Sequence, residues 1–396
     1  MLRRLPILKG ELSPNHALVH HQRIFIHASR VSTYHSYHYR SQSSTNLRAA
    51  LHNELAAQGL RVAVTAAGRG LVACSEFSPG DVVLTENSPL AASGDPATLD
   101  VTCSHCFRAL SIDTFVTCTD CGTRYCTPEC RSSALLTGGH EAVCRGESEI
   151  NAWCAAHGHN FARVAVNAVA RSLTGGRDFS FYWSKINSLA YATPPPTDAL
   201  PRAHVDGYAL VKKTFIFAGR LSGAGVSTFF DTIFNLRAYA RLMGTLRLNA
   251  FTVNARESRN FSEAPLNNRC SSVVGDGSDS NSCTDSVNSC GSGEGSGGGG
   301  CGDTPAALGD APGGTAIYEA ASLANHACEP SCDVVISACG ALALRARKQI
   351  KACEDVSITY LDSSLPVEFR RKKLLLGYGF DCMCTLCRLQ LKRLHV

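Results

Sequence analysis

Eight side chains of the types that bind metal ions lie between residues 103 and 144. They form four closely spaced pairs, Cys103-x2-Cys106, Cys118-x2-Cys121, Cys126-x3-Cys130 and His140-x3-Cys144. A Cys-x2-Cys pair places two thiolates within reach of one ion, at roughly 2.3 Å per Zn–S bond. Four such pairs supply two closed tetrahedral sites, and a site closed by four protein ligands is structural rather than catalytic. The spacing therefore predicts two structural zinc ions.

Short local elements must hold these ligands. Thr127-Pro128-Glu129 is typical of a helix start, with an N-cap hydroxyl, Pro at the first helical position and an early acid, so Cys130 falls in the first turn. Gly138-Gly139 break that helix, and His140 and Cys144 are one helical turn apart, which makes both face one metal. A disulfide scaffold is the alternative. It is disfavoured because a disulfide does not require a His four residues before the last Cys.

A third group of thiols lies near the C-terminus. Cys382-x-Cys384-x2-Cys387 supplies three thiolates, whereas a structural zinc needs four ligands. The next Cys or His is His395 on the terminal tail. The missing ligand must therefore come from elsewhere in the chain.

The ligand order of residues 103–144 resembles a MYND zinc finger. The resemblance implies that the first and third pairs share one zinc ion and that the second and fourth pairs share the other. Spacing alone predicts two sites, and the interleaved pairing comes from the family. MYND fingers bind proteins, so the resemblance implies a protein ligand for this finger.

Four further segments resemble a SET domain with its post-SET zinc segment. They are Gly68-Arg69-Gly70-Leu71-Val72-Ala73, Asn325-His326-Ala327-Cys328-Glu329-Pro330-Ser331-Cys332, Val356-Ser357-Ile358-Thr359-Tyr360-Leu361-Asp362, and Tyr378-Gly379-Phe380-Asp381-Cys382-Met383-Cys384-Thr385-Leu386-Cys387. The finger lies between the first segment and the other three, which is the arrangement of SET-and-MYND (SMYD-type) lysine methyltransferases. The resemblance spans about residues 61 to 388. It implies methyl transfer from S-adenosylmethionine to a lysine of a histone or non-histone protein.

The resemblance also implies roles for individual residues. The cofactor pocket would be lined by Arg69, Gly70, Asn249, Asn325, His326 and Phe380. Cys328 would complete the third zinc site with Cys382, Cys384 and Cys387, and Cys332 is its nearest competitor. The finger ligands would be Cys103, Cys106, Cys118, Cys121, Cys126, Cys130, His140 and Cys144. The chain would thus hold three structural zinc ions.

The chemistry of lysine methylation assigns two tyrosines. A lysine ammonium has a pKa of ~10.4 and must lose a proton, because only the amine has a lone pair. The amine must then be aimed at the methyl group, which is a positioning problem. Tyr360, at the end of an apolar-alternating segment, fits the orienting role, and Tyr378 would help to form the lysine channel. No metal takes part in this chemistry.

The sequence departs from the family at three places. Ser331 stands where Asn is usual, Ala327 where Ser is usual, and Ala352-Cys353 replaces a Pro-Gly turn. The alternative function is therefore a MYND-type interaction adaptor with an inactive SET scaffold. Retention of Asn325, His326, Tyr360 and Tyr378 together favours the enzyme, because a scaffold has no need for that set.

The composition indicates the cellular compartment of the protein and the classes of partner that it can bind. Twenty cysteines in 396 residues, most of them in spaced clusters, are typical of a reducing compartment. Residues 1–50 hold seven Lys/Arg and one acid, and the rest of the chain has 31 Lys/Arg and 32 Asp/Glu. This balance argues against a nucleic-acid-binding surface and is compatible with a basic peptide substrate. We expect a cytoplasmic or nuclear protein without membrane spans. The leader also has transit-peptide composition, which makes mitochondrial import the alternative.

The predicted fold class is α+β, with a SET β-fold interrupted by the finger and a helical insert. Residues 333–362 indicate two strands around a Gly340 turn and a third strand ending at Tyr360. Two helical stripes are expected as core faces, one from Phe161 to Leu173 and one from Phe229 to Met243. The thiols Cys270, Cys283, Cys290 and Cys301 have no metal-site spacing. The predicted regions are a basic, disordered leader (1–57), the first part of the SET domain (58–101), the MYND finger (102–144), the helical insert (145–245), the SET core (246–380) with a Gly-rich, flexible loop (271–314), and the post-SET zinc segment (381–390).

Overall fold

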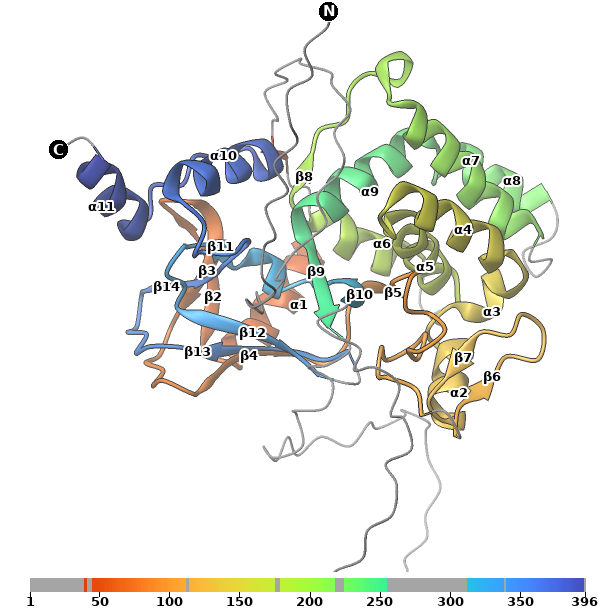
Figure 1. Ribbon diagram of the computed structural model, residues 1–396, viewed down its shortest axis with the longest axis horizontal. Coiled ribbons are helices and arrows are strands. Elements are labelled where there is room, and N and C mark those ends of the chain that lie inside the picture. Colours follow the sequence, from red (N-terminus) through yellow and green to blue (C-terminus); the bar gives the residue numbers. More distant parts are fainter. Residues whose placement is uncertain are drawn as a thin grey trace, which may run out of the picture.

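The computed structural model describes residues 39–40, 45–111, 114–174, 179–217, 224–254, 312–337 and 340–394. Within these residues, most strands gather in one half of the molecule and most helices in the other, with the cysteine-rich finger below those helices (Figure 1). This mixture of segregated helices and strands is the predicted α+β class. None of the described helices has the length and apolarity to cross a membrane.

Three small sheets form the β-fold. The first has the order β11-β14-β3-β2, the second β12-β13-β4 and the third β5-β10-β9. Their strands are β2 (Leu60–Thr65), β3 (Gly68–Ala73), β4 (Val82–Glu86), β5 (Ala91–Gly94), β9 (Ala250–Asn254), β10 (Pro312–Ile317), β11 (Asn325–His326), β12 (Cys332–Ile336), β13 (Leu342–Ala346) and β14 (Asp355–Ile358). Strands from both ends of the sequence therefore share each sheet, and their apolar faces enclose one core.

The three strands predicted in residues 333–362 are confirmed as β12, β13 and β14. The last strand ends at Ile358 rather than at Tyr360. The backbone N–H of Tyr360 donates to His326 Nδ1 at 3.0 Å instead of to a neighbouring strand. The hydrogen bonding of β14 to its neighbouring strands therefore ends at Ile358, directly before the candidate site residue Tyr360.

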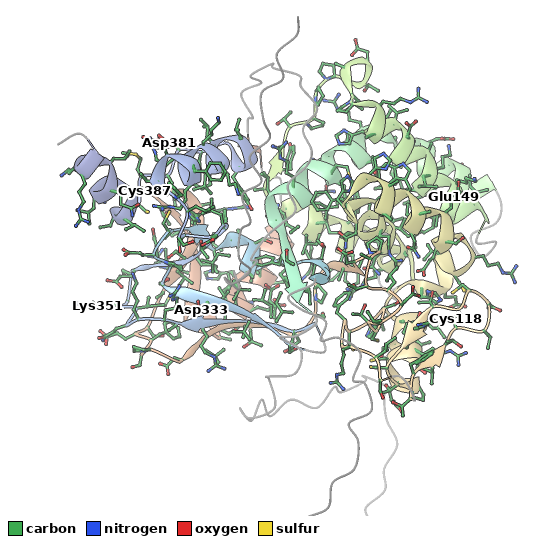
Figure 2. The ribbon with its side chains drawn as sticks, in the orientation of Figure 1. Cys118, Glu149, Asp333, Lys351, Asp381 and Cys387 are labelled. Carbon is green, nitrogen blue, oxygen red and sulfur yellow. The ribbon has the colours of Figure 1, made fainter. Side chains whose placement is uncertain are left out.

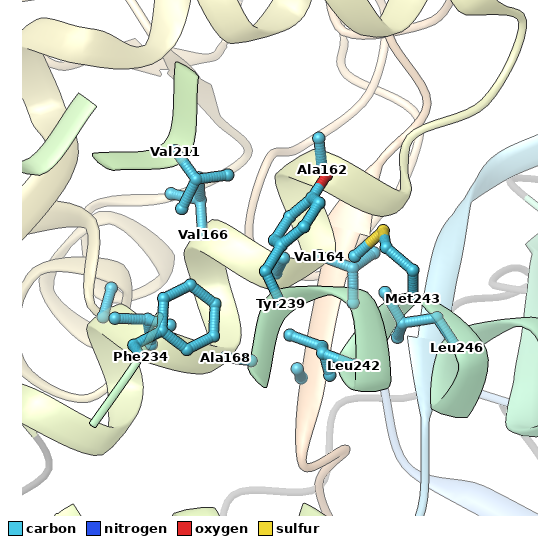
Figure 3. Packing of buried hydrophobic residues seen from close by; sticks show 14 of the residues in the cluster. Ala162, Val164, Val166, Ala168, Val211, Phe234, Tyr239, Leu242, Met243 and Leu246 are labelled. Atoms are coloured by element: carbon cyan, nitrogen blue, oxygen red, sulfur yellow. The ribbon is translucent and has the colours of Figure 1, made fainter. Parts of the chain in front are cut away.

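The helical insert packs around α5, which is buried along most of its length (Figure 3). The first predicted stripe is confirmed as this helix. The second is divided, because Asn235 caps a new helix by accepting from Ala238 N–H at 3.0 Å, and Ile233 in the break is exposed. The insert comprises α4 (Glu147–His157), α5 (Phe161–Thr174), α6 (Phe179–Ser188), η2 (Thr197–Ala199), α7 (Arg202–Phe217), α8 (Ala224–Thr232) and α9 (Leu236–Asn249).

The finger is built from short elements. Its helix starts where predicted, because Thr127 is the N-cap and its Oγ1 accepts from Cys130 N–H at 3.2 Å. The finger elements are β6 (Val116–Thr117), β7 (Arg124–Tyr125), α2 (Pro128–Leu136), α3 (His140–Val143) and η1 (Cys144–Gly146). The remaining elements are β1 (Tyr39–Arg40) paired with β8 (Tyr191–Ala192), α1 (Thr45–Ala56), η4 (Ala321–Leu323), α10 (Val367–Tyr378) and α11 (Thr385–Leu394).

Two predicted boundaries differ from the structure. The leader expected over 1–57 ends in the helix α1, because Leu55 is fully buried in the core beside β2. The loop expected over 271–314 ends earlier, because Pro312 already pairs with Asn254 in the sheet. The rest of that loop, including Cys283, Cys290 and Cys301, lies outside the described residues, as do Cys270 directly before it and the first 38 residues.

Candidate active site and metal centres

Four aromatic side chains that the sequence assigned to the site lie together. The ring of Tyr360 is 4.8 Å from that of Tyr378, 5.3 Å from that of His326 and 6.4 Å from that of Phe380, between centroids. Tyr378 is the last residue of α10, and Gly379 closes that helix with a positive φ of 78°. This left-handed residue reverses the chain, and Phe380 then lies 6.4 Å from Tyr378.

Hydrogen bonds fix Tyr360 and His326. The hydroxyl of Tyr360 donates to the Ala324 carbonyl at 2.8 Å, which fixes the direction of its O–H bond. His326 Nδ1 accepts from Tyr360 N–H, which leaves the ring proton on Nε2, 3.4 Å from Cys328 Sγ. Burial raises the pKa of Tyr378 to about 12, so this hydroxyl stays protonated at neutral pH.

A cavity of about 550 Å³ leads to the two tyrosines. It lies between the edge strands β9 and β12, and the segment 358–364 and Tyr378 close it. Acidic groups of Asp333 and Asp362 and the cation of Arg347 are among its polar lining. A cavity of this size accommodates a long side chain together with part of the peptide that carries it.

Gly70 and Asn325 form a close contact between β3 and β11. A Cβ added at Gly70 would lie 2.2 Å from Asn325 Nδ2, which excludes any other residue type while Asn325 keeps this position. The amide of Asn325 also donates to Thr65 Oγ1 at 3.3 Å. The Asn325 side chain therefore packs directly against Gly70, so the Asn-His segment and the Gly-rich segment are in contact within one sheet.

The other two predicted cofactor residues are engaged locally. Arg69 donates to the Ser188 carbonyl at 3.0 Å and lines a second cavity of about 610 Å³. Asn249 donates to the carbonyls of Ala190 and Thr245, each at 2.7 Å, at the end of α9. Arg69 and Asn249 line different cavities. Of the predicted cofactor residues, Phe380 lies beside the tyrosines, whereas the Asn325 amide is directed at Gly70 and Thr65, and neither residue lines the 550 Å³ cavity. An aromatic face suits a flat heterocycle, and an amide suits its polar edge.

A buried carboxylate supports the turn before Asn325. Glu86 accepts from the N–H groups of Glu319 at 2.9 Å and Ala321 at 2.6 Å. Burial raises the pKa of Glu86 to about 7, although these backbone donors act to lower it. Glu86 thus holds η4, and with it the start of β11.

Three groups of metal-type ligands are assembled among the described residues. In each group the ligand atoms all lie within 4.8 Å of one another. The groups are Cys103/Cys106/Cys126/Cys130, Cys118/Cys121/His140/Cys144 and Cys328/Cys382/Cys384/Cys387. The finger pairs interleave as the MYND resemblance implied. The donor sets, four thiolates or three thiolates and an imidazole, suit zinc.

Cys328, rather than Cys332, joins the C-terminal thiols. Its Sγ lies 3.5 Å from Cys387 Sγ and 4.0 Å from Cys382 Sγ. Cys332 instead lies 3.9 Å from Ser331 Oγ and lines the first cavity. The residues alone had left this choice open.

A buried carboxylate stands behind the second finger group. Glu147 Oε1 lies 3.3 Å from His140 Nδ1, and its Oε2 accepts from Thr123 Oγ1 at 3.0 Å. Arg163 Nη2 lies 4.0 Å from the same carboxylate. Burial acts to raise the pKa of Glu147, but Arg163 and His140 hold it below its usual range. A carboxylate behind a ligating histidine fixes the ring and its tautomer.

A buried guanidinium stands behind the C-terminal group. Arg370 is 1% exposed, and its Nε and Nη2 lie 3.3 Å from Cys328 Sγ and 3.7 Å from Cys387 Sγ. Its Nη1 donates to the carbonyls of Ser363 at 3.1 Å and Leu365. Arg370 therefore joins the thiol cluster to the segment that lines the first cavity.

Sequence reasoning missed Arg370 and Glu147. Arg370 lies in the run Arg370-Arg371-Lys372-Lys373, whose composition suggests a solvated helix face. Glu147 comes three residues after Cys144 and looks like an ordinary helix-start acid. Neither position carries a spacing signal that marks it.

The departures from the family pattern are accommodated locally. Ser331 and Ser357 bond reciprocally: Ser331 N–H donates to Ser357 Oγ at 3.0 Å, and Ser357 N–H donates to Ser331 Oγ at 2.8 Å. Cys353 adopts a positive φ of 69° in the turn before β14, where a Gly would be unstrained. Ala327 keeps its backbone bond to the Ile358 carbonyl at 3.0 Å.

Comparisons with known proteins agree with these features. The family model described as "SET domain" matches residues 68–361. Histone-lysine N-methyltransferase SMYD3 of Mus musculus is 42% identical over 77 residues, which are 19% of this chain and 18% of that protein. Histone-lysine N-methyltransferase ATXR4 of Arabidopsis thaliana is 23% identical over 333 residues, covering 83% of this chain and 86% of that protein.

The match to SMYD3 thus spans less than a fifth of that protein's length. Among solved structures, the SET domain of LSMT bound to lysine and AdoHcy aligns with a TM-score of 0.33 at 14% identity, over 82% of this chain and 53% of that one.

Proposed function

This chain belongs to the SET-domain family, and from that premise we propose that it is a SET-and-MYND protein-lysine methyltransferase, which transfers a methyl group from S-adenosylmethionine to a protein lysine. The observation that carries the proposal is the position of Tyr360 and Tyr378. Both line the 550 Å³ cavity, and both lie within the same aromatic cluster as His326 and Phe380.

The proposed role of the cavity is to desolvate and aim a lysine side chain. The neutral amine would be favoured over the ammonium beside the positive sulfonium of bound S-adenosylmethionine, because a nearby like charge disfavours the charged form. The Tyr360 hydroxyl donates a hydrogen bond to the Ala324 carbonyl, and a hydroxyl oxygen that donates one bond can also accept one, here from an amine N–H. The amine lone pair is thereby directed, and the gain comes from positioning rather than from proton transfer by the phenol.

The proposed cofactor contacts are those of Asn325 and Phe380. S-adenosylmethionine, when bound, supplies the methyl group on a sulfonium that is a good leaving group. The Asn325 amide would hold a polar edge of the ligand, and Phe380 would cover its flat ring. His326 acts through its neighbours, because both of its ring nitrogens are directed at Tyr360 and Cys328.

Three zinc ions are proposed for the three assembled ligand groups, and all are structural because each group closes four ligands. The proposed substrate is a histone or another protein with an accessible lysine in a basic context. The acid Asp362 at the cavity supports this choice, since it favours cationic neighbours of the target lysine, whereas Asp333 is paired with Arg347 at 3.5 Å. The finger's proposed partner is a separate protein ligand.

Two variants test the proposal when a library of lysine-rich peptides and histones is screened for methyl acceptance. Tyr360→Phe keeps the ring and removes the hydroxyl, so transfer should fall by roughly 10²-fold or more. Cofactor affinity, measured by calorimetry, should change much less in this variant. Asn325→Ala should weaken cofactor binding first.

Full transfer by Tyr360→Phe would show that the catalytic assignment is wrong. Absence of S-adenosylmethionine binding by the zinc-loaded wild-type protein would favour the alternative, an interaction adaptor with an inactive scaffold.

A further inference from the structure

A third cavity, of about 800 Å³, lies where the finger, the β-fold and the helical insert meet. Ser104, His105 and Thr137 line it from the finger, Ser337 lines it from the β-fold, and Arg171 and Tyr182 line it from the insert. The proposed methyl transfer uses none of these residues. The cavity therefore calls for a separate explanation.

Arg171 of α5 supplies a cation to this cavity. Its Nη1 donates to the Pro89 carbonyl at 2.6 Å. Its Nε is buried, and it has no hydrogen-bond partner among the residues that the structure describes. Burial lowers the pKa of Arg171, the direction expected for a cation that is removed from water without a carboxylate beside it.

The charge around this cavity is unbalanced. Glu147 is the one carboxylate among the described lining residues, and it is already shared by His140 and Arg163. Arg163 is satisfied in addition by Ser93 Oγ, which accepts from its Nε at 2.7 Å. Arg171 is thus left as a cation without an anionic partner in the described lining.

The rest of the lining suits an oxyanion. Hydroxyl groups of Ser88, Ser104, Ser133, Thr137 and Tyr182 line the same cavity, and hydroxyls donate readily to phosphate or carboxylate oxygens. The Nε edge of a guanidinium, together with Nη2, forms the fork that holds two oxygens of such a group. The volume lies in the range of small-molecule sites.

We propose that this cavity is a binding site for a small molecule that carries a phosphate or carboxylate group, with the Nε edge of Arg171 as its anchor. A ligand bound here would contact all three regions at once. Such a ligand would therefore stabilise the packing of the finger against the β-fold.

Calorimetric titration of the full, zinc-loaded chain with inorganic phosphate and with succinate tests the proposal at low ionic strength. Wild-type protein should bind at least one of these probes saturably. Arg171→Lys keeps the charge but removes the fork, so binding should weaken at least tenfold, and Arg171→Met should abolish it. Arg131→Met is the matched control: its Nε is also buried without a described partner, but Arg131 does not line the cavity.

Zinc content and circular dichroism check that each variant is folded. If Arg171→Met does not fold, the more conservative Arg171→Lys still tests the proposal. The proposal is overturned if neither probe binds wild-type protein, or if Arg171→Lys binds as wild type does. A short peptide rich in glutamate is the third probe, and tight binding of it with no binding of free anions would assign the site to a protein partner instead. None of these measurements depends on methyl transfer, so they stand apart from the outcome for the proposed function.

Discussion

The finger and the C-terminal segment assemble similar thiol clusters at opposite ends of the molecule, as the labels of Cys118 and Cys387 show (Figure 2). They differ in the charged group behind the ligands. In the finger group that contains His140 it is the carboxylate of Glu147, and in the C-terminal group it is the guanidinium of Arg370, which contacts Cys328 and Cys387.

The difference follows from the charge of each donor set. A zinc ion with three thiolates and one neutral imidazole carries one negative charge, and a zinc ion with four thiolates carries two. The finger group that differs in this way is Cys118/Cys121/His140/Cys144, since the finger's other group, Cys103/Cys106/Cys126/Cys130, also has four thiolates. The C-terminal thiols Cys328, Cys382 and Cys387 are almost completely buried, and a buried cation offsets part of their charge. Arg370 is that cation, and it connects the cluster to the cavity segment. Among the described residues, the finger contributes none to the lining of the 550 Å³ cavity.

The largest expected effect separates the two regions by function. Cys384→Ser and Cys121→Ser each remove one half-exposed ligand, and each should lower the zinc content from three ions per chain to two. Methyl transfer should fall on the order of 10²-fold or more in Cys384→Ser, because Tyr378 and Phe380 lose their anchor. It should fall less than tenfold in Cys121→Ser. Elemental analysis measures the zinc content and a methylation assay measures the rate of transfer in each variant. Equal losses of transfer in the two variants would contradict a functional difference between the two regions.

The next effect concerns Arg370. Arg370→Met leaves buried thiolates without their cation, and breaking a buried charge pair costs about 3 to 5 kcal/mol in the free energy of unfolding. Arg371→Met is the matched control, because Arg371 pairs with Asp381 at the surface, where such pairs contribute about 0 to 1 kcal/mol. Urea unfolding of the zinc-loaded proteins measures both values. Similar losses in the two variants would contradict the role of Arg370.

A pH effect is expected on the β-fold side. Glu86 has a pKa of about 7 when folded, above its ordinary value of 4.5, so the folded state binds more protons than the unfolded state between these values. Stability should therefore fall as pH rises from about 4.5 to 7, by up to about 3 kcal/mol from this group. Glu86→Gln should remove that part of the slope in unfolding curves recorded across this range. An unchanged slope would show that Glu86 is not the group that titrates.

Features of this architecture that depend on neighbouring residues can be predicted from the sequence, and features that depend on contacts between distant residues cannot. Ligand pairs within a few residues were identified by spacing, and the Thr127 cap was identified by its own side chain. Cys328 could not be separated from Cys332 by local pattern, because the choice is made by contacts with residues more than fifty positions away. The selection of Arg370 for burial from a run of four cations likewise depends on α11, whose Gln390 accepts from Arg370 Nη2 at 2.5 Å.

The smallest expected effect is confined to the finger. Glu147→Gln keeps the shape but weakens the hold on the His140 ring, so the zinc affinity of that site should fall roughly 10- to 100-fold. Glu149→Gln is the control, since Glu149 makes only an exposed ion pair with Lys213. Competition with a chelator measures how readily each zinc ion is released. Release of the C-terminal zinc should be the same in both variants, and faster release there in Glu147→Gln would mean that the regions are coupled.

The pairing of β3 with β14 has a consequence for biosynthesis. Val72 lies opposite Asp355, so one edge of β3 stays without its partner until the chain beyond residue 358 has emerged. At translation rates of about 5 to 20 residues per second, this delay is on the order of 15 to 60 s. During that time the nascent chain exposes an apolar strand edge while the finger, whose contacts are local, can already fold around its ions. Chaperone dependence should therefore be a property of the β-fold, and the finger should need little assistance.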